Sequence, residues 1–130
     1  IALRYLNAPY LWGGKSPFGI DSAGLVQMVY KLIGIRLQRE VSLQYDSIKN
    51  DVNSLQEAEV GDLLFFTNNV GRIVHVGILI QSGYLIHAYG KVRVDRIEPE
   101  GIYDVDTQKI THSLYAIKRI LDDDEKKLTK

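Results

Sequence analysis

Ser22, His75 and His87 have the residue types that nucleophilic catalysis uses. Ser22 follows Asp21 and precedes an apolar, helix-periodic run, so we expect it at the first turn of a helix. Backbone N–H groups and the helix dipole stabilise an anion at such a position. A serine hydroxyl there still needs a general base to become a nucleophile. Ser22 is equally explained as one more polar residue at a helix start, where serine is common.

The two histidines lie in consecutive apolar stretches that read as strands, residues 73–81 and 84–89. A three-residue loop, 81–83, would place His87 opposite Gly77 and diagonal to His75, whereas a two-residue loop would turn His87 to the other face. Because Gly77 has no side chain, the two imidazoles could meet across it. One would then orient the other, as the third member of a catalytic triad does. Each histidine alone is also explained as a hydrogen-bonded strand residue.

Other candidate residues have an ordinary alternative as well. Asp21 is a strong N-cap candidate, but its carboxylate could also hold a ligand ammonium group. Tyr10 and Trp12 suit either a core or the wall of a groove. A third histidine, His112, is expected in a polar loop. The histidine spacing contains no His-x-His or His-x-x-x-His pair, so we expect no metal site.

The order of elements predicts an α+β fold, with N-terminal helices packed on a central antiparallel sheet. Helical periodicity comes first, and strand-like runs joined by short turns follow. Helices are expected at residues 22–33 and 42–48, with Ser42 as cap; strands at 63–66, 73–81, 84–89, 92–97 and 114–121; and loops at 50–54 and 98–113.

Composition limits the class of protein. The chain has 130 residues, 45% of them apolar and 25% charged, with zero formal net charge, which gives no electrostatic footprint for nucleic acid. It contains no cysteine, so disulfides and thiolate metal sites are excluded. We expect one domain over residues 1–121, cut from a longer protein, and a charged, disordered tail over residues 122–130.

Five sequence blocks occur in a fixed order, and together they are much more specific than any one alone. They read Pro9-Tyr10-Leu11-Trp12-Gly13-Gly14, Gly19-Ile20-Asp21-x-x-Gly24-Leu25-Val26, Gly61-Asp62-Leu63-Leu64-Phe65-Phe66, His75-Val76-Gly77-Ile78 and Ile86-His87-Ala88. In this order they resemble the NlpC-type peptidoglycan cysteine peptidases. The resemblance covers roughly residues 1–121.

The resemblance implies a papain-like fold in which the helix that carries the nucleophile packs on an antiparallel sheet. It also implies cleavage of cell-wall stem peptides, commonly between the γ-carboxyl of D-glutamate and a diamino acid. The catalytic set of the family, Cys-His and a polar third residue that is often His, falls on position 22, His75 and His87. No cofactor is implied.

The family also suggests how substrate is held and where the protein works. Members that need a free L-Ala amino terminus hold it with the residues matching Tyr10 and Asp21, while Trp12 would line the groove. Ala23 replaces a family serine whose hydroxyl can contact the substrate. The implied partners are stem peptides or freed muropeptides, with SH3-like domains upstream. We expect a monomer in the bacterial envelope, although members that recycle wall peptides work in the cytoplasm.

The departure from the family is Ser22, which stands where the family has cysteine. A hydroxyl is deprotonated far less readily by His75 than a thiol, so a large loss of rate is expected. Three explanations are open: an introduced substitution, a natural peptide-binding module, and a working Ser-His-His hydrolase. The intact residues around position 22 favour the first, a disabled γ-D-glutamyl-diamino-acid endopeptidase, with the non-catalytic binding module as the alternative.

Overall fold

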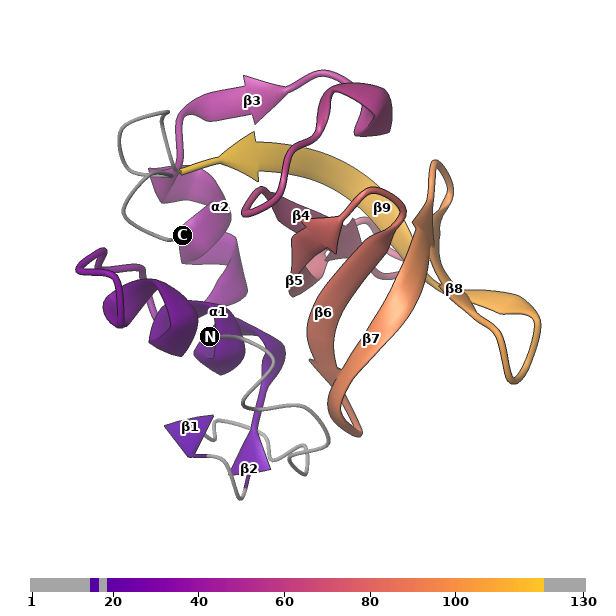
Figure 1. Cartoon of the computed structure of the whole chain (residues 1–130), viewed down its shortest axis with the longest axis horizontal. Coiled ribbons are helices and arrows are strands. Elements are labelled where there is room, and N and C mark those ends of the chain that lie inside the picture. The colour runs from indigo at the N-terminus through magenta and orange to yellow at the C-terminus, as the bar shows by residue number, and fades with distance from the viewer. Residues whose placement is uncertain (1–14, 17–18, 121–130) are drawn as a thin grey trace.

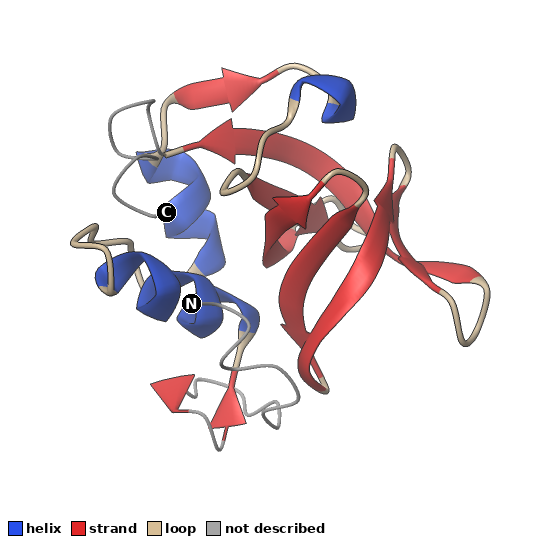
Figure 2. Ribbon diagram, in the orientation of Figure 1, coloured by secondary structure: helices blue, strands red, loops and turns tan. Residues whose placement is uncertain are grey.

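The computed structural model describes the backbone of residues 15–16 and 19–120 and the side chains of residues 21–120 (Figure 1). The expected tail, residues 122–130, lies outside this part of the chain. In chain order the elements are β1 Lys15–Ser16, β2 Gly19–Ile20, α1 Ser22–Lys31, α2 Val41–Ser47, β3 Asn50–Val52, the 3₁₀ helix η2 Leu55–Glu57, β4 Leu63–Thr67, β5 Ile73–Gln81, β6 Tyr84–Tyr89, β7 Lys91–Glu98, β8 Gly101–Asp104 and β9 Lys109–Arg119. The fold is α+β, as predicted, with the helices before the main strands (Figure 2).

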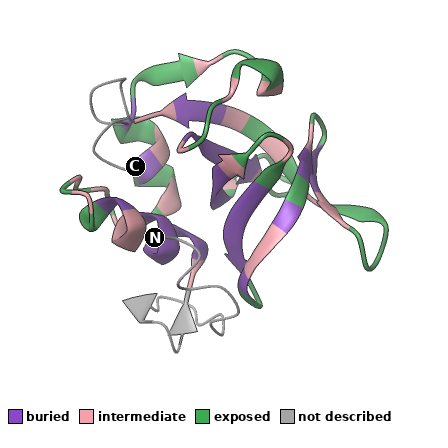
Figure 3. Ribbon diagram, in the orientation of Figure 1, coloured by how far each residue is buried: buried purple, intermediate pink, exposed green. Residues whose placement is uncertain are grey.

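Helix α1 begins where its sequence indicates and ends two residues earlier than expected. The Asp21 carboxylate accepts a hydrogen bond of 2.6 Å from the Gly24 N–H, so Asp21 is the N-cap. Gly34 has φ +88°, and its N–H donates to the Lys31 carbonyl, which stops the helix as expected. Figure 3 shows that burial is concentrated in the first half of α1. The expected helix over residues 22–33 is two residues too long, because α1 ends at Lys31 and Leu32 beyond it is 57% exposed.

Helix α2 differs from the prediction at its start. Its N-cap is Glu40, without a side-chain cap bond, and Ser42 lies inside the first turn instead of capping it. Gln44 is the buried residue of this helix, and its amide donates to the carbonyls of Ala23 and Gln38. The bond to Ala23 ties α2 to the beginning of α1, and the bond to Gln38 ties it to the segment between the two helices.

The main sheet is antiparallel and closes on itself. Its strand order is β3-β9-β4-β5-β6-β7-β8, and an additional β8–β9 pairing joins strands β4 to β9 into a barrel. The predicted loop over residues 98–113 is therefore wrong, because it contains β8 and the start of β9. The predicted loop over residues 50–54 contains β3, which pairs with β9. Both segments are polar in sequence because much of their surface faces solvent.

The barrel wall separates two clusters of apolar side chains. On the outer side, Leu25 and Val26 of α1 pack in one cluster with Val76 and Ile86, which face the helices from β5 and β6. The inner cluster takes residues from every barrel strand: Leu64, Phe66, Leu79, Leu85, Ile97, Ile102 and Ile117. Side chains alternate between the two clusters along each strand, so register decides which residues face the barrel interior. Within the described chain, no helix is long and apolar enough to cross a membrane.

The β5–β6 hairpin has the register that the chemistry requires, but by a different route. Gln81 pairs with Tyr84 across a two-residue turn, so of the two alternative loops the shorter one is present. The register shifts between Leu79 and Gln81, where Ile80 is the extra residue of a β-bulge. His87 is consequently opposite Gly77, the arrangement that was expected only with a three-residue loop. The bulge supplies the odd residue that the shorter loop lacks.

Candidate active site

His75 and His87 meet at one end of the barrel. His75 lies near the start of β5 beside Phe66, His87 lies near the end of β6, and both face the barrel interior. His75 Nε2 is 2.8 Å from His87 Nδ1, with the rings perpendicular at 89°. Their exposed fractions are 6% and 0%. Gly77 leaves no room for a side chain between the strands at this point, because an added Cβ would lie 3.2 Å from the His87 Cβ.

Asp95 of β7 extends this pair to a third group that the sequence interpretation missed. Its Oδ2 is 2.7 Å from His87 Nε2, and its side chain is buried. Arg93 binds the same carboxylate, with Nη2 donating to Oδ1 at 3.0 Å and Nε 2.7 Å from Oδ2. The available signal was Asp95 at an inward position of a strand, two residues from Arg93. We call His75, His87 and Asp95 the relay.

Electrostatics keep the relay imidazoles neutral and the carboxylate charged. Burial lowers the pKa of His75 well below its usual value, and the nearby His87 and His112 add to this. Burial also lowers the pKa of His87, although Asp95 acts in the opposite direction. Burial alone would raise the pKa of Asp95, but hydrogen bonds from His87 and Arg93 hold it below its usual value. The relay is thus two neutral imidazoles hydrogen-bonded in series to an ionised carboxylate.

His112 belongs to this end of the barrel and not to a polar loop. It lies on β9, and its ring stacks on His75 with centroids 4.2 Å apart and planes at 26°. The Tyr89 ring meets it edge-on at 4.7 Å. Burial lowers the pKa of His112 to about 4. The misplacement follows from the start of β9: the strand was expected to begin at residue 114, but it begins at Lys109 and includes His112.

Ser22 and Ala23 are the first two residues of α1 and are both buried. Helix α1 contacts β5 and β6, the strands of the two relay histidines, and its first turn is the end nearer β6 (Figure 1). Within the described residues, the structure shows no hydrogen bond between the Ser22 hydroxyl and His75. The Ala23 carbonyl accepts from the Gln44 amide at 3.1 Å. The structure therefore joins the histidines directly and places Ser22 on the helix packed against their strands.

Asp21 has a charged partner beside its capping role. Arg39 donates to both carboxylate oxygens of Asp21, at 3.1 and 2.9 Å. A ligand ammonium at Asp21 would share that carboxylate with the guanidinium. The other expected substrate contacts, Tyr10 and Trp12, lie outside the described residues.

The three histidines are close together but are not arranged as metal ligands. Four of their six ring nitrogens are bonded within the protein, because His75 Nε2 bonds to His87 Nδ1, His87 Nε2 to Asp95, and His112 Nδ1 to the Thr111 hydroxyl. Across residues 21–120, no group of three or more histidine, aspartate or glutamate side chains could hold a metal ion.

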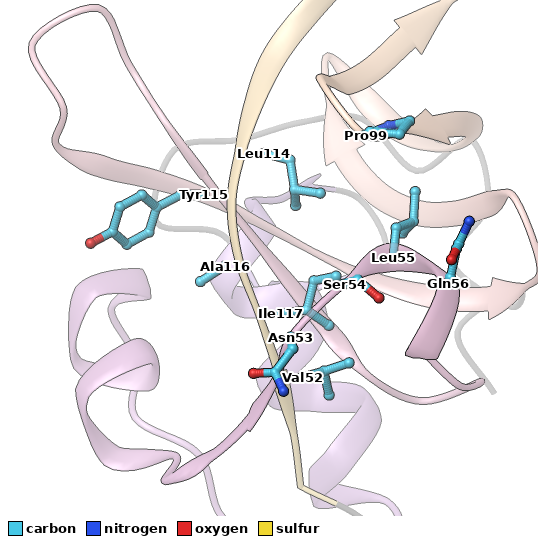
Figure 4. A pocket seen from close by; sticks show the side chains of 10 residues that line it. All are labelled: Val52, Asn53, Ser54, Leu55, Gln56, Pro99, Leu114, Tyr115, Ala116 and Ile117. Atoms are coloured by element: carbon cyan, nitrogen blue, oxygen red, sulfur yellow. The ribbon is translucent and has the colours of Figure 1, made fainter.

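A groove of about 410 Å³ lies elsewhere on the barrel, between β3, η2 and β9 (Figure 4). It is lined by Val52, Asn53, Ser54, Leu55, Gln56, Pro99, Leu114, Tyr115, Ala116 and Ile117. None of these belongs to the relay or to the first turn of α1. The candidate active site therefore rests on the chemistry of the relay and not on this groove.

Comparisons with known proteins agree on one family. The NlpC/P60 family matches residues 7–113. The Bacillus subtilis gamma-D-glutamyl-L-lysine dipeptidyl-peptidase is 36% identical over 86 residues, which are 65% of this chain and 28% of that protein. A Staphylococcus aureus structure, described as similar to a lipoprotein of the NLP/P60 family, is 32% identical with a TM-score of 0.73 and covers 94% of this chain and 39% of that one. RipD from Mycobacterium tuberculosis, described as a non-catalytic NlpC/p60 domain protein adapted to peptidoglycan binding, shares the fold at 22% identity and a TM-score of 0.71, covering 92% of each chain.

Proposed function

Because this chain belongs to the NlpC/P60 family, we propose that it is a peptidoglycan hydrolase domain of the cysteine-endopeptidase type with a papain-like fold. Its bond is the one between the γ-carboxyl of D-glutamate and the diamino acid of a stem peptide. The observation that carries this proposal is the buried His75–His87 hydrogen bond beside the helix that holds position 22. The name of the B. subtilis relative supports the choice of bond.

The reaction runs in two steps when position 22 is cysteine. The thiolate of residue 22 attacks the carbonyl carbon, and the oxyanion faces the N–H groups at the start of α1, which have no partner within the helix. His75 holds the thiol proton and delivers it to the leaving amine. Water, deprotonated by His75, then hydrolyses the thioester. His87 holds the His75 ring in place throughout.

Ser22 disables this chemistry. A thiol readily forms an ion pair with an imidazole, whereas a hydroxyl stays neutral and depends on His75 as a general base. The pKa of His75 is lowered by burial, so this imidazole is a weak base. We infer that the chain retains the binding surface and the relay but lacks an effective nucleophile.

The amino end of the substrate is assigned to the start of α1. Asp21 would hold the free ammonium with Tyr10, while Trp12 lines the groove and Ala23 lies where the family has serine. In this arrangement Arg39, which already binds Asp21, competes with the ammonium. This competition favours stem peptides that gain further contacts elsewhere in the substrate-binding groove at the start of α1.

The wider context of the domain is also a proposal. We place the peptidase domain at residues 1–121, followed by the charged tail 122–130, as a monomeric module of an envelope protein with SH3-like domains upstream. The description of the S. aureus structure as similar to a lipoprotein supports the envelope. Recycling of freed muropeptides in the cytoplasm is the competing location.

The test is to restore the nucleophile. Ser22→Cys is incubated with purified stem peptides, and the products are identified by mass spectrometry; Ser22→Ala is the matched control. We expect cleavage between D-glutamate and the diamino acid by the cysteine variant only. Failure of Ser22→Cys to cleave any stem peptide would overturn the hydrolase proposal.

A second candidate, a non-catalytic module that binds peptidoglycan peptides, is favoured by Ser22 itself and by the published description of RipD. Titration of the unmodified chain with L-Ala-γ-D-Glu peptides, followed by calorimetry, measures binding. Binding combined with no cleavage by Ser22→Cys would establish this candidate in place of the hydrolase.

A further inference from the structure

The relay ends on a carboxylate whose surroundings fix its charge. Asp95 is buried, so an ionised carboxylate there needs strong partners. His87 and Arg93 supply them at 2.7–3.0 Å, and Asp104 Oδ1 of β8 lies 3.8 Å from Arg93 Nη2, the nitrogen that also donates to Asp95 Oδ1. Asp95 is thus an acceptor at both oxygens and a donor at neither.

This fixed acceptor determines where the protons of the two imidazoles lie. His87 Nε2 faces Asp95 Oδ2 at 2.7 Å, so it carries the proton that makes this bond. The other nitrogen of a neutral His87, Nδ1, is then an acceptor. It faces His75 Nε2 at 2.8 Å, so His75 Nε2 carries a proton in turn. The remaining nitrogen, His75 Nδ1, is left unprotonated.

We propose that Asp95 is a positioning residue that sets the direction of the His75–His87 hydrogen bond and so keeps His75 Nδ1 free to accept a proton. Without the carboxylate, His87 Nε2 would face Arg93, which can only donate. His87 would then carry its proton on Nδ1 and donate to His75 Nε2. The proton of His75 would move to Nδ1, the position that a general base must keep empty.

The consequence for catalysis rests on the proposed function, but the direction of the hydrogen bond does not. It can be measured in the protein as it stands, with Ser22 in place. Long-range ¹H–¹⁵N correlation spectra of the histidine-labelled protein distinguish protonated from unprotonated ring nitrogens. Near neutral pH we expect both His75 and His87 to carry their single proton on Nε2.

The variant that tests the cause is Asp95→Ala. We expect its spectra to show His75 and His87 protonated on Nδ1. Asp104→Ala is the matched control, because it removes the other carboxylate near Arg93 without touching either histidine, and it should leave the parent pattern unchanged. Parent spectra with the proton of His87 on Nδ1, or an unchanged pattern in folded Asp95→Ala, would overturn the proposal. If Asp95→Ala does not fold, the parent spectra alone decide.

Kinetics then test the catalytic consequence. In the Ser22→Cys background, Asp95→Ala should lower kcat by about 100-fold or more, the scale that proton transfer contributes, with a much smaller change in KM. Asp104→Ala should keep the parent kcat. Reversed protonation in Asp95→Ala together with an inactive Ser22→Cys parent would refute the hydrolase function but support the role of Asp95. Reversed protonation with an unchanged kcat would refute its importance for catalysis.

Discussion

Gly77 is the residue whose replacement most directly tests the geometry of the histidine pair. A Cβ added to it would lie 2.5 Å from Leu85 Cδ1, 3.1 Å from the Ile86 carbonyl oxygen and 3.2 Å from the His87 Cβ. The Leu85 methyl can rotate away, but the other two atoms are fixed to β6. Relief of the contacts therefore requires β6 to move away from β5 by a few tenths of an ångström.

We expect Gly77→Ala to reduce stability and activity together. Overpacking of this kind costs about 1–3 kcal/mol, partly offset by about 0.4–1 kcal/mol from the reduced freedom of the unfolded chain. The net loss of unfolding free energy should be about 1–2 kcal/mol. Because His87 moves with β6, its 2.8 Å bond to His75 lengthens. In the Ser22→Cys background kcat should fall on the order of 10-fold, given that a 1 Å misplacement can cost about 100-fold.

Urea unfolding and muropeptide cleavage measure the two effects. Ile97→Val is the control, since it removes one methylene from the same barrel interior at a residue outside the relay and costs about 0.5–1.5 kcal/mol. It should leave kcat unchanged at a similar loss of stability. Gly77→Ala with the stability and kcat of its parent would show that the close approach of β5 and β6 is unimportant.

Three further predictions concern stability and specificity. His112 has a folded-state pKa of about 4, against 6.5 in the unfolded chain. The unfolded chain therefore binds more protons below pH 6.5, and the unfolding free energy falls as the pH is lowered. About 3 kcal/mol of this loss should disappear in His112→Phe, as measured by urea unfolding from pH 7 to 4. Gly101 has φ +153°, and a Cβ there would collide with a backbone carbonyl. Gly101→Ala should therefore lower the unfolding free energy by at least about 2 kcal/mol, against about 1 kcal/mol for Gly71→Ala, where the space is open. Equal losses in the two variants would refute the clash. Arg39→Met in the Ser22→Cys background should lower KM for peptides with a free amino terminus but not for N-acetylated ones. The variant removes the guanidinium that competes with the substrate ammonium for the Asp21 carboxylate. An equal change of KM for both kinds of peptide would refute the competition.

Local sequence predicted the parts of the fold whose pattern is determined locally. The alternating, β-branched run from Ile73 to Gln81 is strand β5, and Asp21 caps α1 as its position before an apolar run indicates. Strand β8 and the first residues of β9 were read as loop, because their burial depends on pairing with other strands and not on their own hydrophobicity. Because this segment was read as loop, the β8–β9 pairing that closes the barrel was not predicted either.

The candidate site shows the same division. The register argument identified the arrangement in which His87 lies opposite Gly77, and a bulge at Ile80 and not a longer loop produces it. His112 could not be assigned from spacing, because it reaches the histidine pair through β9, which pairs with remote strands. Asp95 lies on β7, the hairpin partner of β6, and was overlooked although the pairing is local. A sequence pattern identifies which residues could react, whereas a closed sheet decides which of them are neighbours.

Barrel closure also has a consequence for the time at which the site matures. Strand β9 is the last described strand, and it pairs with β4 and β8 at once. Such contacts between distant segments form slowly compared with a local hairpin such as β5–β6. A chain still emerging from the ribosome can bring its two relay histidines together, but it lacks the dry interior that β9 completes. Peptidase chemistry in a cysteine-bearing chain would therefore begin only after the C-terminal strand has docked, which delays activity until synthesis of the domain is finished.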